Sequence, residues 1–298
     1  MMSAVMDRTT GIGARTWVRR FAWATLVANI GIVVTGGAVR LSGSGLGCPT
    51  WPRCHDGSFT PHGELNLHSA IEFGNRTLTF VLTAIAIATF VSALGTGRRD
   101  LRRLALLLAL SVPAQAVLGG ITVLTDLNPW VVAFHLLFSM GIISLAVLYV
   151  HRTEHPASAG EATRRHTVVA WSTYAAAWVV LALGTVVTGS GPHAGDVNAP
   201  RNGLDPLQLS QLHADFVFLL VGLTVALVIV HPSRTTWTLL GVELAQGLIG
   251  FVQYFTDLPA VLVGFHLLGA SLVAAAATWV LIEVREGSAP RAVSDARA

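Results

Sequence analysis

Apolar residues in this chain come in long blocks separated by short polar segments, not in strict alternation with polar residues. A block of roughly 20 apolar residues is long enough to cross a bilayer as a helix, whereas alternation is typical of strands. We therefore predict an all-α membrane protein with eight transmembrane helices. The predicted spans are 19–39, 69–94, 104–124, 130–151, 167–189, 207–230, 236–256 and 260–283.

The composition also favours a membrane protein over a soluble one. Of the 298 residues, 53% are hydrophobic and only 12% are charged, and the mean hydropathy is +0.62. A soluble domain carries about 25% charged residues. The lipid bilayer is therefore the first partner that we expect.

The basic residues, all of them arginine, gather on one side of the predicted spans. The sequence pI of about 9.4 could suggest nucleic acid. However, the clusters adjoin membrane spans, as the positive-inside rule describes, so we expect no nucleic-acid partner. Both termini are predicted to be cytoplasmic, which an even number of spans permits, in the cell (plasma) membrane. The arginines on that side are Arg8, Arg15, Arg19, Arg20, Arg98, Arg99, Arg102, Arg103, Arg152, Arg164, Arg165, Arg234, Arg285, Arg291 and Arg297.

The two cysteines, Cys48 and Cys54, fall in the first loop on the opposite, outer side. That side is oxidising in a bacterial-type membrane, so a disulfide is permitted there. Their spacing is neither CxxC nor a zinc pattern. A structural disulfide and a redox pair both stay open.

The two halves of the chain repeat one another. The stretch VVTG occurs at 33–36 and again at 186–189, and FHLL occurs at 134–137 and at 265–268. Repeats with an even number of spans have parallel orientation, so each half is a four-helix unit with its own intramembrane site. We divide the chain into an N-terminal cytoplasmic segment, an N-terminal bundle, a cytoplasmic linker, a C-terminal bundle and a cytoplasmic tail, at 1–18, 19–151, 152–166, 167–283 and 284–298.

Histidines occupy matching positions near the outer ends of the spans. His135 corresponds to His266 in the repeat, and His213 lies near the outer end of the sixth span, two spans before the one that carries His266. Ionisable residues at membrane depth are rare and are usually functional. Two facing imidazoles form a bis-histidine haem site, whereas a closed zinc site needs four ligands. The His213–His266 pair therefore predicts haem b, although histidines bonded to backbone carbonyls are the alternative.

The first half departs from this pattern. Asn75 stands where the repeat would place a histidine, so His135 is the only strong iron ligand there. Glu72 lies one helical turn before Asn75, where a carboxylate can act in proton transfer. An ion pair with Arg76 is the alternative for Glu72. Arg76 and Arg40 suit haem propionates, but both could be interfacial arginines.

These stretches resemble the haem A synthase family. Residues 34–54, VTGGAVRLSGSGLGCPTWPRC, are similar to its first-loop signature, and residues 71–76, IEFGNR, resemble its Glu-x-x-His-Arg motif. The resemblance covers roughly residues 20 to 283. It implies oxidation of the C8 methyl group of haem O to the formyl group of haem A, through successive hydroxylations and loss of water, for use in terminal oxidases.

The resemblance also implies roles for individual residues. His213 and His266 would hold the haem b cofactor, His135 would face the substrate haem, and Glu72 would be the catalytic carboxylate. Cys48 and Cys54 would be the outer-loop pair, which can form a disulfide in this family. Asn75 replaces the histidine of the motif, and we treat Asn75 as lining the site.

Other functions explain fewer features. A quinone-linked membrane cytochrome b accounts for the paired histidines but not for Glu72 or the cysteine loop. A thiol oxidase would normally need a second cysteine pair, and a transporter would account only for the repeat. A haem O synthase is the expected partner by the logic of the pathway, together with an electron donor that the sequence does not identify.

Overall fold

The computed structural model describes residues 2–55, 57–60, 67–155 and 163–287, and for residues 2–15 the backbone alone. The described residues form eight helices and no strand, and all eight helices are long and apolar enough to cross a membrane. This confirms the predicted all-α architecture. The helices are α1 (Met2–Leu41), α2 (Leu67–Leu94), α3 (Arg99–Leu124), α4 (Pro129–Glu154), α5 (Arg164–Ser190), α6 (Pro206–Val230), α7 (Arg234–Phe255) and α8 (Ala260–Arg285).

The helices extend past the predicted apolar blocks because their polar ends also continue the backbone hydrogen bonding. Helix α1 begins at Met2, so the predicted segment 1–18 is largely continuous with the first span. Helix α4 ends at Glu154 and α5 begins at Arg164. Within the predicted linker 152–166 and tail 284–298, residues 156–162 and 288–298 lie outside the described residues.

Side-chain caps define several helix starts. The Asn128 side chain accepts a hydrogen bond from the Trp130 backbone N–H at 3.0 Å, and Asp205 accepts one from Leu207 at 2.8 Å. A proline follows each cap, where its missing N–H costs no helical hydrogen bond. Ser233 caps α7 in the same way, by accepting from the Thr236 N–H at 3.2 Å.

Matching turns confirm the repeat at the level of the backbone. Asp126 and Leu127, between α3 and α4, have φ values of 51° and 59°. Asp257 and Leu258, between α7 and α8, have φ values of 58° and 55°. Such positive φ values are uncommon for residues other than glycine. The same unusual turn therefore closes the same hairpin in both halves.

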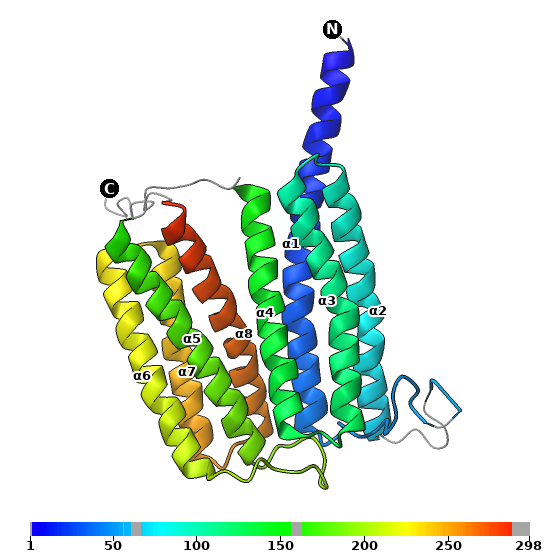
Figure 1. The fold of residues 1–298 in the computed structure, drawn as a ribbon, viewed down its shortest axis with the longest axis vertical. Helices are drawn as coiled ribbons and strands as arrows, with labels where there is room; N and C mark the ends of the chain where they lie inside the picture. Colours follow the sequence, from blue (N-terminus) through cyan, green and yellow to red (C-terminus); the bar gives the residue numbers. More distant parts are fainter. Residues whose placement is uncertain (1, 56, 61–66, 156–162, 288–298) are drawn as a thin grey trace.

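The helices pack as two four-membered rings, one from each half (Figure 1). In the first ring, α2 and α4 each contact both α1 and α3. In the second ring, α6 and α8 each contact both α5 and α7. The rings meet where α4 contacts α8, α1 contacts α8 and α4 contacts α5, which is the pattern expected of two-fold pseudosymmetry.

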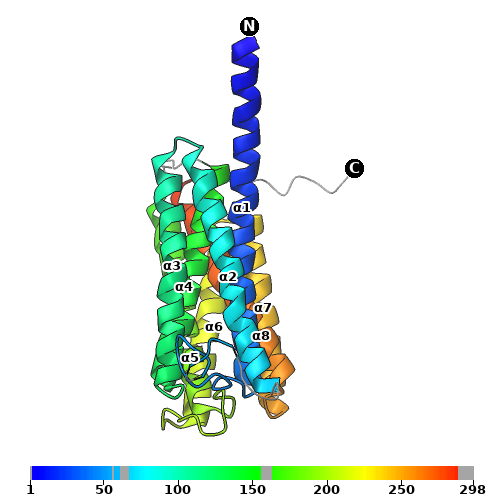
Figure 2. The same ribbon diagram turned by 90° about the vertical axis from the view of Figure 1, so that its right-hand side faces the viewer.

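The bundle has two distinct ends. Helix α1 begins and α8 finishes at one of them, which we call the termini end (Figures 1 and 2). The opposite end, the loop end, carries the cysteine loop after α1 and the turns between α3 and α4 and between α7 and α8. All the predicted site residues lie toward the loop end of their helices, which confirms that they gather on one side of the bundle.

Small and medium side chains fill the junction between the rings. Thr278 of α8 donates a hydrogen bond to Ser144 of α4 at 2.9 Å, and Ile143 and Ala146 beside it are fully buried. Large apolar side chains such as Phe80 instead lie on the outside. This distribution suits a protein surrounded by lipid, where close packing of small residues holds helices together.

Candidate functional site

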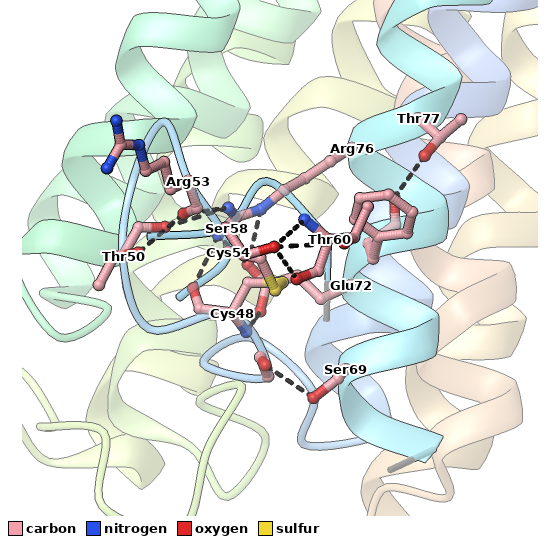
Figure 3. Close-up of a disulfide and its surroundings, with 12 residues drawn as sticks. Cys48, Thr50, Arg53, Cys54, Ser58, Thr60, Ser69, Glu72, Arg76 and Thr77 are labelled. Carbon is pink, nitrogen blue, oxygen red and sulfur yellow. Dashed lines mark hydrogen bonds and ion pairs between the residues drawn. A yellow bond between two sulfur atoms is a disulfide. The ribbon is translucent and has the colours of Figure 1, made fainter. Parts of the chain in front are cut away.

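The cysteine loop is closed by a disulfide between Cys48 and Cys54, which confirms that the two cysteines pair. The S–S distance is 2.01 Å and the Cα atoms are 4.4 Å apart. Both cysteines are fully buried although they lie in a loop. The short ring of chain that they close sits against α2, which carries Glu72 and Arg76 (Figure 3).

Glu72 binds this loop directly. One carboxylate oxygen, Oε2, accepts a hydrogen bond from the Cys48 backbone N–H at 2.7 Å, and the other, Oε1, accepts one from Arg76 Nε at 3.0 Å. Glu72 is only 5% exposed. A buried carboxylate is stable only when it is paired and hydrogen-bonded, and both conditions hold here. The ion pair with Arg76, which the sequence left as an alternative, is therefore present.

Arg76 also binds the backbone of the cysteine loop. Its Nη1 donates to the carbonyl of Thr50 at 3.0 Å, and its Nη2 donates to the carbonyl of Cys48 at 2.8 Å. Its guanidinium is therefore used for the carboxylate and the loop backbone (Figure 3). Glu72 and Arg76 together fix the disulfide ring above the N-terminal bundle.

Glycines let the loop approach the helices closely. A methyl group on Gly120 of α3 would lie 2.3 Å from the ring of Trp51, and one on Gly47 would lie 2.6 Å from the His68 carbonyl oxygen. Any larger residue at these positions would push the loop away. The repeat places Phe251 where the first half has Gly120. The C-terminal bundle therefore lacks the space in which Trp51 packs.

His135 and His266 occupy equivalent places in the two bundles. A methyl group on Gly119 of α3 would lie 3.5 Å from Cε1 of His135, and one on Gly250 of α7 would lie 3.5 Å from Cε1 of His266. In each histidine, Nδ1 is buried without a hydrogen-bond partner. Neither of these two histidines is therefore fixed to a backbone carbonyl through Nδ1, whereas the His213 ring does lie within reach of the Val180 backbone.

The C-terminal bundle brings a second imidazole to this place. His213 of α6 lies against Gly184 of α5, since a methyl group there would be 3.2 Å from its Cε1. It is close enough to His266 for the two rings to interact electrostatically, and its Nδ1 is likewise buried and unpartnered. Unpartnered buried ring nitrogens that share one bundle fit a pair of axial ligands.

Within the described ranges, no three His, Cys, Asp or Glu side chains converge as a metal-ion site.

The N-terminal bundle has an amide where the second imidazole would be. Thr35 of α1 donates a hydrogen bond to Oδ1 of Asn75 at 2.8 Å, so the shorter side chain is held against α1. Gly31 matches Gly184 in the repeat, but a methyl group on Gly31 would meet nothing within 4 Å. The space that an imidazole fills in the second half is open in the first.

Arg40 links the two bundles at the loop end. Its Nε donates to the His193 carbonyl at 2.5 Å and its Nη2 to the Thr188 carbonyl at 3.0 Å, both in the second half. Arg201 lies close by, and its own guanidinium donates to the carbonyls of Ala199 and Pro192. The sequence did not anticipate that Arg40 joins the halves, or that a second arginine accompanies it.

The sequence also missed the residues that support the histidines. Gln246 donates from Nε2 to the His266 carbonyl at 2.7 Å. Its counterpart Gln115 donates to Ser139 at 2.5 Å, and Ser139 in turn donates to the His135 carbonyl at 3.0 Å. The constant interval between glutamine and histidine in both halves was the signal that could have revealed this support.

Comparison with known proteins points to one family. A family model described as cytochrome oxidase assembly protein, COX15-CtaA, matches residues 19–70 and 64–198. The chain is 31% identical over 153 residues to a haem A synthase of Shewanella oneidensis, an alignment that covers 46% of this chain and 45% of the relative. It is 38% identical over 120 residues to a haem A synthase of Bacillus pumilus, covering 39% of this chain and 38% of the relative. The matched region thus spans less than half the length of these curated relatives.

Proposed function

The chain belongs to the COX15-CtaA family of cytochrome oxidase assembly proteins, and from this premise we propose that it is a haem A synthase. The substrate would be haem O, whose C8 methyl group becomes the formyl group of haem A. The observation that carries the proposal is the difference between the surroundings of His135 and those of His266. The two histidines share one helical frame, yet among the described residues only the first bundle carries a disulfide loop with a buried carboxylate, Glu72, bonded to it.

We assign the histidine site of the C-terminal bundle to a haem b cofactor with His213 and His266 as its axial ligands. The fit rests on the buried, unpartnered ring nitrogens and on the glycines that lie against both rings. A haem bound there would supply one-electron redox chemistry. Gln246 would then act as a positioning residue, because it holds the carbonyl of the residue that binds iron.

We assign the region around His135 in the N-terminal bundle to the substrate. His135 would bind the haem O iron, and Asn75 would line the opposite face without binding it strongly. Oxidation of a methyl carbon releases protons, and Glu72 would accept them or stabilise the positive charge that develops. Arg76 would hold Glu72 in place, while Arg40, together with Arg201, would attract the propionates.

The orientation and the partners are also part of the proposal. The cysteine loop would face the outside of the cell membrane and both termini the cytoplasm, because the arginines gather at the termini end. An electron donor must reduce the haem b, and a haem O synthase would supply the substrate.

The direct test is mass spectrometry of haem extracted from cells that make haem O but not haem A. We expect the wild-type chain to produce haem A or its hydroxymethyl precursor. We expect His135→Ala to leave haem O unchanged while the haem b spectrum persists, which makes it the matched control. Unchanged haem O with the wild-type chain, in the presence of a working electron donor, would reject the proposal.

One other function has a specific observation in its favour. Asn75 replaces a ligand in the first bundle, so a chain that only passes electrons would still keep the His213–His266 pair intact. Such a membrane cytochrome b would bind unaltered haem and form no modified haem. The same extraction distinguishes it, because it would give haem b alone.

A further inference from the structure

Glu243 is a carboxyl group in the middle of a membrane helix, and none of the roles above uses it. It lies in α7 and is 3% exposed. Its Oε1 accepts a hydrogen bond from Thr224 of α6 at 2.9 Å, while its Oε2 is buried with no partner. An ionised carboxylate with no cation beside it is costly in an apolar interior. A carboxyl at this depth is a functional suspect.

No other titratable group lies at this depth in the helices that pack against α7. Its packing partners are α6 and α8. Helix α6 contributes His213 and Asp215, and α8 contributes His266, with Tyr254 of α7 also at the loop end. The remaining charged residues of these helices are at the termini end: Arg234, Glu283 and Arg285. Glu243 is therefore the single titratable side chain in the middle of α6, α7 and α8.

Glu243 lies on the same face of α7 as the residues that contact His266, the predicted haem ligand. Glu243, Gln246 and Gly250 share one face of α7, since residues three and four positions apart lie side by side. Gln246 binds the His266 carbonyl and Gly250 lies against the His266 ring. With a rise of 1.5 Å per residue, Glu243 lies about 10 Å from Gly250 along the axis. It touches neither histidine, yet it faces the same interior.

The first half lacks this arrangement. The repeat places Val112 at the position of Glu243 and Ala86 at the position of Thr224. The carboxyl and its hydroxyl partner therefore occur only in the bundle with two histidines. A role limited to helix packing would not explain why they accompany the second imidazole.

We propose that Glu243 binds a proton when the haem held by His213 and His266 is reduced, and releases it when that haem is oxidised. Each electron that enters the C-terminal bundle then brings one proton with it, so the low-dielectric interior gains no net charge. The electron comes from the reduced donor, and the proton comes from water. This inference rests on the proposed haem b site but not on the oxidation of haem O.

The test is a redox titration of the purified, haem-loaded protein with dithionite and mediators at several pH values. A proton taken up on reduction makes the midpoint potential fall as pH rises. We expect this slope in the wild type and a smaller slope in Glu243→Gln, which keeps the shape of the side chain and its acceptor for Thr224. The slope that remains would come from the haem propionates.

Three comparisons keep the result interpretable. Glu283→Gln makes the same chemical change at the termini end of the same bundle and should leave the slope unchanged. Thr224→Val should move the pH range of the slope without removing it. An infrared difference spectrum of reduction should show a carboxylic acid C=O band in the wild type that Glu243→Gln lacks.

The possible failures are distinct. A slope and an infrared band that are identical in Glu243→Gln and the wild type would overturn the role of Glu243 and leave the haem site standing. Absence of a low-spin haem in the wild type would overturn the haem b site and, with it, this inference. Loss of haem from Glu243→Gln alone would also overturn it, because the residue would then be needed to build the site.

Discussion

The two bundles share a helical frame, turns and one histidine each, and differ in what stands around that histidine. In the C-terminal bundle, a second imidazole lies close to the first, and a lone buried carboxyl lies deeper on α7. In the N-terminal bundle, an amide is held back by Thr35, and a disulfide loop sits on Glu72 and Arg76. The two halves of the repeat thus carry two imidazoles in the C-terminal bundle and one imidazole with an amide in the N-terminal bundle.

This difference has a chemical meaning. An iron with two strong axial ligands has no free position and is suited to electron transfer, whereas an iron with one strong ligand leaves a face open for chemistry. The loop and its carboxylate lie on the N-terminal bundle, to which we assign the iron with one strong ligand.

The largest effect should come from the imidazole pair. His213→Ala or His266→Ala should abolish the low-spin haem b spectrum, because neither bundle then has two strong ligands. Visible absorption and electron paramagnetic resonance of the purified protein measure this directly. His135→Ala, the matched change in the other half, should keep the spectrum. Retention of the low-spin signal in both variants of the pair would refute the ligand assignment.

Glu72→Gln should separate chemistry from cofactor binding. Glutamine can still accept the Cys48 N–H, but it carries no charge and cannot take up a proton. We expect haem A output to fall by about 100-fold or more, the range typical of lost acid–base catalysis. The haem b spectrum should remain. Normal output would mean that Glu72 serves only to hold the loop.

The double substitution Cys48→Ser and Cys54→Ser tests the loop that only the first bundle has. Closing so short a ring stabilises the fold by about 2 kcal/mol through the entropy of the unfolded chain. Thermal unfolding in detergent should occur at a lower temperature, and reduction of the wild type should reproduce the change. The haem b spectrum below the transition should be unaltered, because the C-terminal bundle lacks this loop. An unchanged unfolding temperature would contradict the stabilising role.

Asn75→His should make the first bundle resemble the second. The open space beside Gly31 can admit an imidazole, as the space beside Gly184 does for His213. We expect a second low-spin signal when haem occupies both bundles, seen by electron paramagnetic resonance. A single low-spin signal at full haem loading would show that position 75 does not face the iron.

The smallest expected effect is on the pH dependence of stability, and it comes from His231 at the termini end. Burial lowers the pKa of His231, although Glu283, whose Oε1 is 4.0 Å from its Nε2, acts in the opposite direction. A neutral His231 therefore stabilises the fold above its unfolded pKa of about 6.5, and this contribution is lost as the pH falls below that value. The unfolding temperature should drop on acidification less steeply in His231→Gln than in the wild type. His155→Gln, an exposed control, should behave like the wild type, and equal pH profiles in all three proteins would refute the effect.

Much of this protein could be predicted from its sequence alone. The bilayer fixes the length of an apolar span, so block length identified all eight helices. The repeat aligned His135 with His266 and exposed Asn75 as the exception, because a duplicated frame keeps equivalent residues in equivalent places. A carboxyl in the middle of α7 was equally visible in the sequence, and Glu243 could have been identified from its depth.

Other features depended on which surfaces meet, and only the tertiary structure decided them. His231 directly follows α6 in a short polar loop, yet His166 of α5 and Glu283 of α8 lie against it and it is buried. The Glu72 carboxylate could have pointed toward a haem site, toward Arg76 alone or toward the loop. In the structure it binds both Arg76 and the loop. Arg40 reaches carbonyls more than a hundred residues away. Apolar periodicity records which residues avoid water, but pairing between distant polar atoms depends on how the helices and loops are set against one another.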